Sequence, residues 1–119
     1  MPHAIIERSD NLVHDFIEHD IDLVDIIHGV MMEVGLFDLN AIKTREITYD
    51  NFMVGEKGQD GSFVHISIAI LTGRTLEQRE TLTSAILDAT VEALKELEID
   101  SITVEVREME KVTYRKAVA

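Results

Sequence analysis

The 119-residue chain contains no cysteine or tryptophan, only one proline, and few basic side chains. Without cysteine it has no disulfide, no zinc–thiolate site and no thiol nucleophile. It has no apolar run approaching the roughly 18 residues that cross a membrane, and its first residues lack the basic and apolar pattern of an export signal. We therefore expect a cytoplasmic protein with no membrane partner.

Positive charge is scarce. Lys and Arg number 11 against 23 Asp and Glu, so the net charge is -12. Such a chain repels nucleic acid over most of its surface, because phosphate binding requires a cationic face. A small anionic ligand is compatible with this charge if the few basic residues converge in one place. Length and composition otherwise predict one domain, residues 1–119.

Apolar periodicity predicts four strands and two helices. The strands cover residues 2–8, 41–49, 63–71 and 101–109, and the third of them is almost continuously apolar. One helix spans about residues 20–34 and stops at Gly35. The other opens with the capping-box pattern Thr75-Leu76-Glu77-Gln78 and carries an apolar stripe made of Leu82, Ile86, Ala89, Ala93 and Leu97. Residues 11–19 fit either an early helical turn or a packed loop.

The elements follow the order β-α-β and then β-α-β, and the two halves, about residues 2–49 and 63–109, are faintly similar. We predict an α+β fold in which tandem βαβ repeats form a four-stranded mixed sheet with two helices on one face. The other sheet face would then be bare. Because soluble proteins rarely leave a large apolar face in water, we expect a homo-oligomer that forms through it.

Three basic residues are candidates for binding an anion. Lys43 and Arg45 lie two apart on a predicted strand, so both point from one face at a separation of about 7 Å. A solvated strand face is the alternative explanation for this pair. Arg74 follows Gly73 at the start of a helix, where free backbone N–H groups favour anions and the helix dipole disfavours a cation.

The histidines give weaker signals. His14 and His19 suggest a metal-binding module, but an i, i+5 spacing does not place both rings on one face of a helix. His3 and His65 lie at matching places in the two halves and are typical of packed structural histidines.

Pro2 is the only proline and directly follows Met1. A small second residue usually permits removal of Met1, which would leave a secondary amine at Pro2. The alternative is a proline that merely begins a strand, where its missing N–H does no harm.

The opening residues are the most distinctive stretch of the chain. They read Met1-Pro2-His3-Ala4-Ile5-Ile6-Glu7-Arg8-Ser9-Asp10-Asn11, a pattern that resembles the 5-carboxymethyl-2-hydroxymuconate Δ-isomerase family of the tautomerase superfamily. Further similar stretches follow in the family's order: Gly35-Leu36-Phe37, Ile42 with Arg45, Phe63-Val64-His65, and Gly73-Arg74-Thr75-Leu76-Glu77 with Arg79. They cover most of the chain, and as a set they are quite specific.

The resemblance implies a trimer of tandem βαβ units that requires no metal or organic cofactor. It implies that Pro2 is the catalytic base and that Arg74, with Lys43 or Arg45, binds a small unsaturated 2-hydroxy or 2-oxo acid from aromatic-ring catabolism. The family carries Ile-Arg-x-Arg on its second strand, where this chain reads Ile42-Lys43-Thr44-Arg45. Lysine is a point charge without the bidentate fork of arginine, so carboxylate recognition would be looser or altered.

A base at Pro2 has to be neutral near neutral pH, although an ordinary α-amino group titrates at about 8. Burial and neighbouring cations would both lower the pKa of the amine toward the range in which a general base works best.

Three other functions are compatible with the sequence. The same scaffold could serve another tautomerase, a decarboxylase or a hydratase acting on a related unsaturated acid, with divergence at Lys43 and in the loop at residues 50–61. The chain could instead be a non-enzymatic acidic trimeric binding protein, in which Pro2 only begins a strand. The third alternative is a metal-binding module that uses His14 and His19.

Overall fold

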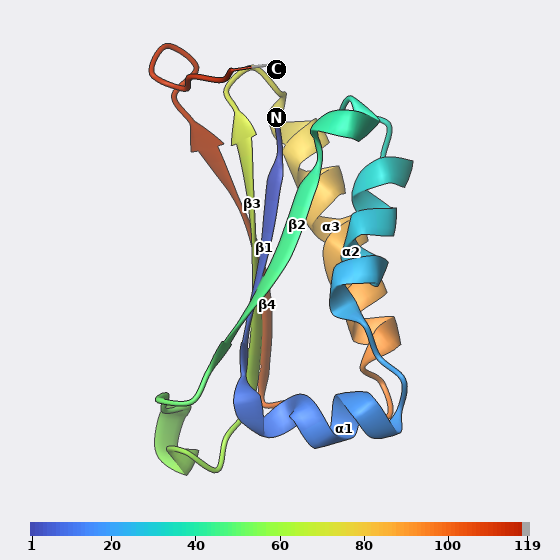
Figure 1. Cartoon of the computed structure of the whole chain (residues 1–119), viewed down its shortest axis with the longest axis vertical. Helices are drawn as coiled ribbons and strands as arrows, with labels where there is room; N and C mark the ends of the chain where they lie inside the picture. The colour runs from blue at the N-terminus through green and yellow to red at the C-terminus, as the bar shows by residue number, and fades with distance from the viewer. Residues whose placement is uncertain (118–119) are drawn as a thin grey trace.

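The predicted strands form one mixed sheet, and the two longer helices pack on the same face of it (Figure 1). The computed structural model describes residues 1–117. Its main elements are β1 His3–Ser9, α1 Val13–Glu18, α2 Leu23–Glu33, β2 Lys43–Tyr49, β3 Phe63–Leu71, α3 Leu76–Ala93 and β4 Ser101–Met109. The predicted α+β architecture is therefore confirmed.

The order of strands in the sheet is β2-β1-β3-β4. The outer pairs, β1 with β2 and β3 with β4, are parallel, whereas the central pair of β1 and β3 is antiparallel. His3 lies opposite Lys43 on one side and opposite Ala69 on the other. The beginning of β1 therefore lies between the beginning of β2 and the end of β3.

The core lies between the sheet and the helices. Alternate residues of β1 and β3 point into it and are fully buried or nearly so: Ala4, Ile6, Val64, Ile66, Ile68 and Ile70. The predicted stripe on α3 is confirmed in part, because Leu82 and Ile86 are fully buried and Ala93 and Leu97 pack against the core. The fully buried row continues instead through Thr90 and the C-cap Leu94 and passes beside Ala89. Thr90 is tolerated there because its hydroxyl donates to the Ile86 carbonyl at 2.7 Å.

Local hydrogen bonds place the starts of α2 and β2 later in the sequence than predicted. The carboxylate of Asp22 caps α2 by accepting from the Asp25 N–H, so this helix starts at Leu23, three residues later than predicted. A single 3-10 turn at Leu39–Ala41 delays β2 to Lys43. Residues 11–19 complete a short turn and then form α1. No helix among residues 1–117 has both the length and the apolar composition needed to cross a membrane.

The sheet face without helices is not the bare apolar surface that the sequence predicted. Its middle carries a polar network in which Glu105 is the hub. The Glu105 carboxylate accepts from Arg107 Nε at 3.0 Å and from the Ser67 hydroxyl at 3.2 Å, and it lies 2.7 Å from His65 Nε2. The other ring nitrogen of His65 lies 2.6 Å from the Thr103 hydroxyl. Both β3 and β4 thus present hydrogen-bonding groups on this face.

The capping box of α3 gives a direct test of local stability. In Thr75→Ala the N–H of Gln78 loses its acceptor at 3.0 Å, and the reciprocal bond from the Thr75 N–H to Gln78 Oε1 loses its support. We expect the free energy of unfolding in urea to fall by about 1 kcal/mol. Thr81→Ala, at an exposed position within the same helix, is the control and is expected to be neutral or slightly stabilising. Equal losses in the two variants would contradict a capping role.

Glu105 gives a test of acid stability. Hydrogen bonds from Arg107 and then from His65 lower the pKa of its carboxyl from 4.5 to about 2. The ionised carboxylate therefore stabilises the fold fully above about pH 4.5, and this contribution is lost as the pH falls toward 2. We expect urea titrations to show the wild type losing its advantage over Glu105→Gln across that interval. Glu80→Gln on α3 controls for the change in net charge, and a constant advantage down to pH 2 would contradict the network.

Candidate active site

Pro2 lies at the head of the central strand pair. Its side chain is fully buried, and its carbonyl accepts from the Lys43 N–H at 3.2 Å, which extends the parallel ladder between β1 and β2 by one bond. Because Met1 precedes it, the Pro2 nitrogen is an amide in this chain and the free α-amine belongs to Met1. Cleavage after Met1 would place a secondary amine at the same point.

Arg74 reaches this end of the sheet because β1 and β3 are antiparallel neighbours, as the sequence required for a meeting with Pro2. Gly73, at φ +125°, turns the chain directly after β3 in a conformation that L side chains rarely adopt. The Arg74 guanidinium donates to the Leu36 carbonyl, and its carbon lies 5.4 Å from the centre of the Phe37 ring. Two of the stretches that carry the family resemblance are therefore in contact with each other.

Lys43 and Arg45 share the sheet face that the helices leave open. Thr44, between them, points the other way and bonds to His28 of α2 at 2.7 Å. Arg45 lies further along the strand, with Nη1 3.1 Å from His3 Nδ1. Burial, followed by the charges of Arg45 and Lys43, lowers the pKa of His3. Lys43 thus acts on the charge of the terminal amine, whereas Arg45 lies against His3.

The terminal α-amine lies in a positive environment. Its pKa is lowered from its ordinary value of 8.0, first by burial and then by the charges of Lys43, Lys116 and Arg74, while Asp38 acts in the opposite direction. Two of the three predicted cations therefore act on the amine directly. This is the electrical environment that a neutral basic amine needs.

The sequence interpretation missed the last part of the site. Residues 110–116 turn back after β4 and lie beside the N-terminus (Figure 1). Tyr114 Oη lies 3.1 Å from His3 Nε2 with the two rings edge to face, and Lys116 Nζ lies 3.4 Å from Met1 Sδ. The available signal was the concentration of basic residues near the end of an acidic chain: Lys111, Arg115 and Lys116.

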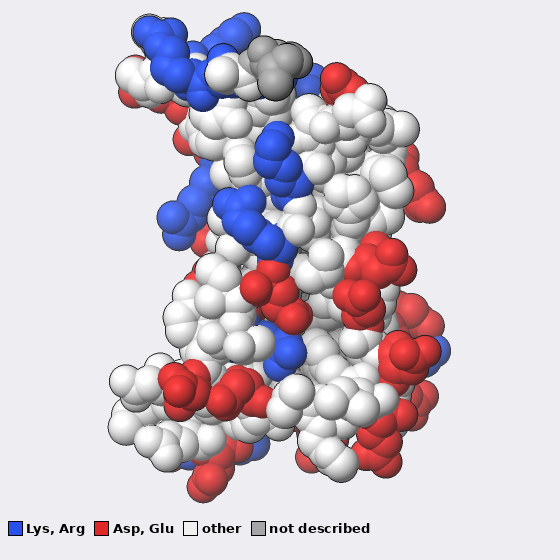
Figure 2. Space-filling view, in the orientation of Figure 1, with Lys and Arg blue, Asp and Glu red and all other residues white. Residues whose placement is uncertain are grey.

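The cations of the molecule differ in whether a carboxylate lies beside them. Five of the eleven Lys and Arg residues form ion pairs with carboxylates: Arg8, Lys57, Arg79, Lys95 and Arg107. Within residues 1–117 the other six have no carboxylate within 4.0 Å: Lys43, Arg45, Arg74, Lys111, Arg115 and Lys116. Figure 2 shows much of the blue gathered over the end where both termini lie, with red over the opposite half. The local convergence of cations that an anionic ligand requires is present.

Two hollows adjoin the N-terminus. One, of about 310 Å³, includes Met1, Phe37, Arg74 and Lys111 in its lining. The other, of about 490 Å³, includes Met1, Lys43, Arg115 and Lys116.

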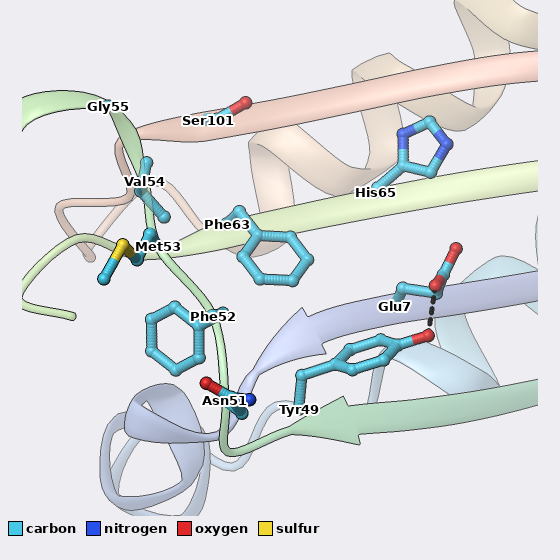
Figure 3. Close-up of a pocket in the computed structure, with 10 residues that line it drawn as sticks. All are labelled: Glu7, Tyr49, Asn51, Phe52, Met53, Val54, Gly55, Phe63, His65 and Ser101. Carbon is cyan, nitrogen blue, oxygen red and sulfur yellow. Dashed lines mark hydrogen bonds between the residues drawn. The ribbon is translucent and has the colours of Figure 1, made fainter. Parts of the chain in front are cut away.

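A larger hollow of about 680 Å³ lies at the far end of the sheet (Figure 3). Phe52 and Phe63 pack edge to face in it, and Tyr49 donates to the Glu7 carboxylate. No described Lys or Arg lines this hollow, and Glu7 gives it negative charge. An anion is therefore favoured at the terminal end of the sheet and disfavoured here, although this hollow has the larger volume.

The possible metal ligands of the chain are His, Asp and Glu, since it has no cysteine. Across residues 1–117 no three His, Asp or Glu residues are grouped so that they could hold a metal ion. His14 lies on the surface of α1, with Nε2 3.7 Å from Glu18.

Known proteins are similar to this chain in both sequence and fold. The sequence profile of the 5-carboxymethyl-2-hydroxymuconate isomerase family matches residues 2–118. The chain belongs to this family. A 5-carboxymethyl-2-hydroxymuconate Delta-isomerase from Escherichia coli is 31% identical over 83 residues, which make up 67% of this chain and 62% of that relative. The resemblance noted in the sequence is therefore confirmed.

Solved structures agree on the fold of this family member. A 5-carboxymethyl-2-hydroxymuconate isomerase from Deinococcus radiodurans R1 superposes with a TM-score of 0.82 at 20% identity, covering 98% of this chain and 88% of that one. A wild-type fused 4-OT, described as a symmetric trimer, gives a TM-score of 0.72 at 14% identity over 97% of this chain and 91% of that one. At these identities the similarity concerns the fold alone.

The charge environment of the amine is open to direct measurement. In protein that keeps Met1 and carries ¹⁵N-methionine, we expect NMR titration to give an α-amine pKa below 8.0, and Lys43→Gln to raise it by removing a neighbouring charge. Lys95→Gln is the matched control, since Lys95 is paired with Glu92 at 2.6 Å on the surface. An ordinary pKa, or the same rise in both variants, would show that the cations do not act on the amine.

Proposed function

We propose that this family member is a cytoplasmic isomerase that moves a proton within a small unsaturated 2-hydroxy or 2-oxo acid similar to 5-carboxymethyl-2-hydroxymuconate. The main support is the cationic environment that lowers the pKa of the terminal amine. The names of the family and of its Escherichia coli relative supply the substrate class. An acid of this type would belong to the breakdown of aromatic compounds.

In the proposed reaction Pro2 is the base, after cleavage of Met1 has exposed its nitrogen. The neutral amine accepts the proton of the 2-hydroxyl group and becomes an ammonium, while the electrons of the O–H bond move into the conjugated system as a dienolate. The ammonium then returns the proton to a carbon of that system, which yields the 2-oxo acid and restores the neutral amine. A single group thus serves first as base and then as acid.

Cations stabilise the negative charge that develops in this reaction. Among the residues that the structure describes, Arg74 makes one side-chain hydrogen bond, to the Leu36 carbonyl, so further donors of its guanidinium can meet a carboxylate or a developing oxyanion. Lys43 donates to the Ala41 carbonyl at 2.9 Å and keeps other N–H groups for the ligand. Because an ammonium lacks the planar fork of Arg, Lys43 favours a looser carboxylate contact than the family's Arg would make.

We also propose a homotrimer. A fused 4-OT with the same fold is described as a symmetric trimer. The open sheet face and its adjoining loop expose apolar side chains that a neighbouring copy would cover, among them Ile47, 44% exposed, and Met53, 79% exposed.

The decisive variant is Pro2→Ala. Ultraviolet spectroscopy follows ketonisation of a 2-hydroxymuconate dienol by both proteins, after intact mass has shown that Met1 is absent from each. We expect kcat/KM to fall by about 100-fold or more, as when a positioned general base is displaced. In the wild type, activity should rise with pH until the Pro2 amine is neutral, because only the neutral form accepts a proton.

A matched preparation separates chemistry from folding. Wild-type chain that retains one residue before Pro2 has an amide in place of the amine and is expected to be inactive, with an unchanged circular dichroism spectrum. Equal rates for processed wild type and for the chain that retains a residue before Pro2 would refute the proton-transfer role. Turnover of a related acid but not of the muconate dienol would favour another activity of the superfamily, consistent with Lys43 in place of Arg.

A further inference from the structure

The imidazole ring of His3 lies between a guanidinium and a phenol. Arg45 Nη1 is 3.1 Å from His3 Nδ1, and Tyr114 Oη is 3.1 Å from His3 Nε2. A guanidinium can only donate, so His3 Nδ1 has to accept this bond and carries no proton. A charged ring is disfavoured as well, because burial and the charges of Arg45 and Lys43 lower the pKa of His3. The neutral ring therefore carries its proton on Nε2.

This tautomer determines the direction of the hydrogen bond between His3 and Tyr114. The Nε2–H of His3 donates to the phenol oxygen, so the proton of the phenol is not used in this bond. Among residues 1–117 the Tyr114 hydroxyl has no other hydrogen-bond partner. It therefore keeps one O–H that can donate to a ligand.

Tyr114 is held beside the place of the proposed base. Its ring is half-buried and packs edge to face on His3, and its backbone N–H donates to the Glu110 carbonyl at 3.1 Å. Tyr114 and Met1 line the same hollow of about 490 Å³. Cleavage after Met1 would leave the Pro2 amine at the edge of this hollow, with a fixed neutral donor in its wall.

We propose that Tyr114 donates its O–H to the 2-oxygen of the bound acid, and that Arg45 and His3 orient the phenol for this bond. The inference rests on the proposed function, in which the Pro2 amine removes the proton of the 2-hydroxyl group. As that proton leaves, the electron pair of the O–H bond enters the dienolate and the 2-oxygen gains negative charge. The phenol stabilises this charge and keeps its own proton. Tyr114 is then a catalytic residue, and His3 and Arg45 are positioning residues.

The chemistry of the reaction favours the 2-oxygen as the partner of a neutral donor. A carboxylate carries its full charge throughout the reaction, so a bond to it stabilises the bound acid and the transition state alike. The 2-oxygen is neutral in the hydroxy acid and in the oxo acid and is negative only between them. A hydrogen bond to it therefore strengthens where the barrier lies. Because His3 orients the phenol before the acid binds, no reorganisation is needed at that moment.

The kinetic test compares Tyr114→Phe with Tyr49→Phe, both in protein without Met1. These are the two tyrosines of the chain, and Tyr49 donates to Glu7 at the far end of the sheet. Each variant thus loses one phenol hydroxyl, but only Tyr114→Phe loses it beside the terminus. Ultraviolet spectroscopy follows ketonisation of 2-hydroxymuconate.

We expect Tyr114→Phe to lower kcat at least about tenfold with little change in KM, as the loss of a donor to a developing oxyanion would predict. Tyr49→Phe should match the wild type. An unchanged kcat in Tyr114→Phe, or the same loss in both variants, would overturn the role of the phenol.

A double-mutant cycle tests the positioning role of His3. His3→Leu removes the donor to Tyr114 Oη and should lower kcat, whereas His3→Gln offers an amide N–H in its place and should retain most of it. Because His3 acts through the phenol, His3→Leu should cause no further loss in a chain that already carries Tyr114→Phe. Losses that multiply in the double variant, with unchanged circular dichroism, would overturn the positioning role.

Binding distinguishes failure of this contact from failure of the proposed function. Calorimetry measures the dissociation constants of 2-oxoadipate and adipate, which differ only in the 2-oxygen. We expect the wild type to bind 2-oxoadipate at least about threefold more tightly, as one neutral hydrogen bond would predict. Tyr114→Phe should reduce this preference without weakening adipate, and Tyr49→Phe should keep it.

The two assays together separate the outcomes. If no dienol is turned over while Tyr114→Phe selectively weakens 2-oxoadipate, the proposed reaction fails and the contact stands. If dienols are turned over while Tyr114→Phe changes neither kcat nor the preference for 2-oxoadipate, the contact fails and the reaction stands.

Discussion

The antiparallel pairing of β1 with β3 determines where every group of the site lies. It places the beginning of β1 beside the end of β3, so that the turn at Gly73 delivers Arg74 to the terminus. The parallel pairing of β1 with β2 brings Lys43 opposite His3 from the other side. A slip of one residue in either register would turn alternate side chains to the opposite face of the sheet, and a slip of two would move them by about 7 Å. Both slips are unfavourable, because they would displace the fully buried alternate residues of β1 and β3 from their places in the core.

Charge is segregated on this scaffold. Carboxylates pair with five of the cations, while six others have none within 4.0 Å in residues 1–117. Concentrating like charges costs free energy, and the packing of Tyr114 on His3 opposes that cost. The remaining negative surface repels polyanions in general, so that only an anion small enough to enter the terminal recesses is attracted. The net negative charge thus excludes polyanions, whereas the local positive charge attracts small anions.

Much of this arrangement could be predicted from the sequence, and the misses have physical causes. β3 and β4 begin and end as predicted, because their runs of β-branched residues leave little ambiguity. The starts of α2 and β2 were wrong, since the local bonds of Asp22 and Asp38 decide them. Lys43 and Arg74 could be placed from strand topology alone. The segment after Met109 could not, because its contact with His3 joins residues 111 positions apart and leaves no periodic pattern.

The contact between Tyr114 and His3 also has a consequence for biosynthesis. An aminopeptidase that removes Met1 must hold the extended terminus in its own active site, whereas here Lys116 lies on the Met1 sulfur and Pro2 is fully buried. Residues 111–116 lie after every strand in the sequence, so they are translated after β1 and β3. Until they have been made and have folded, nothing from this segment covers the terminus. Maturation of the amine is therefore favoured during translation and hindered once the polypeptide has been released and folded.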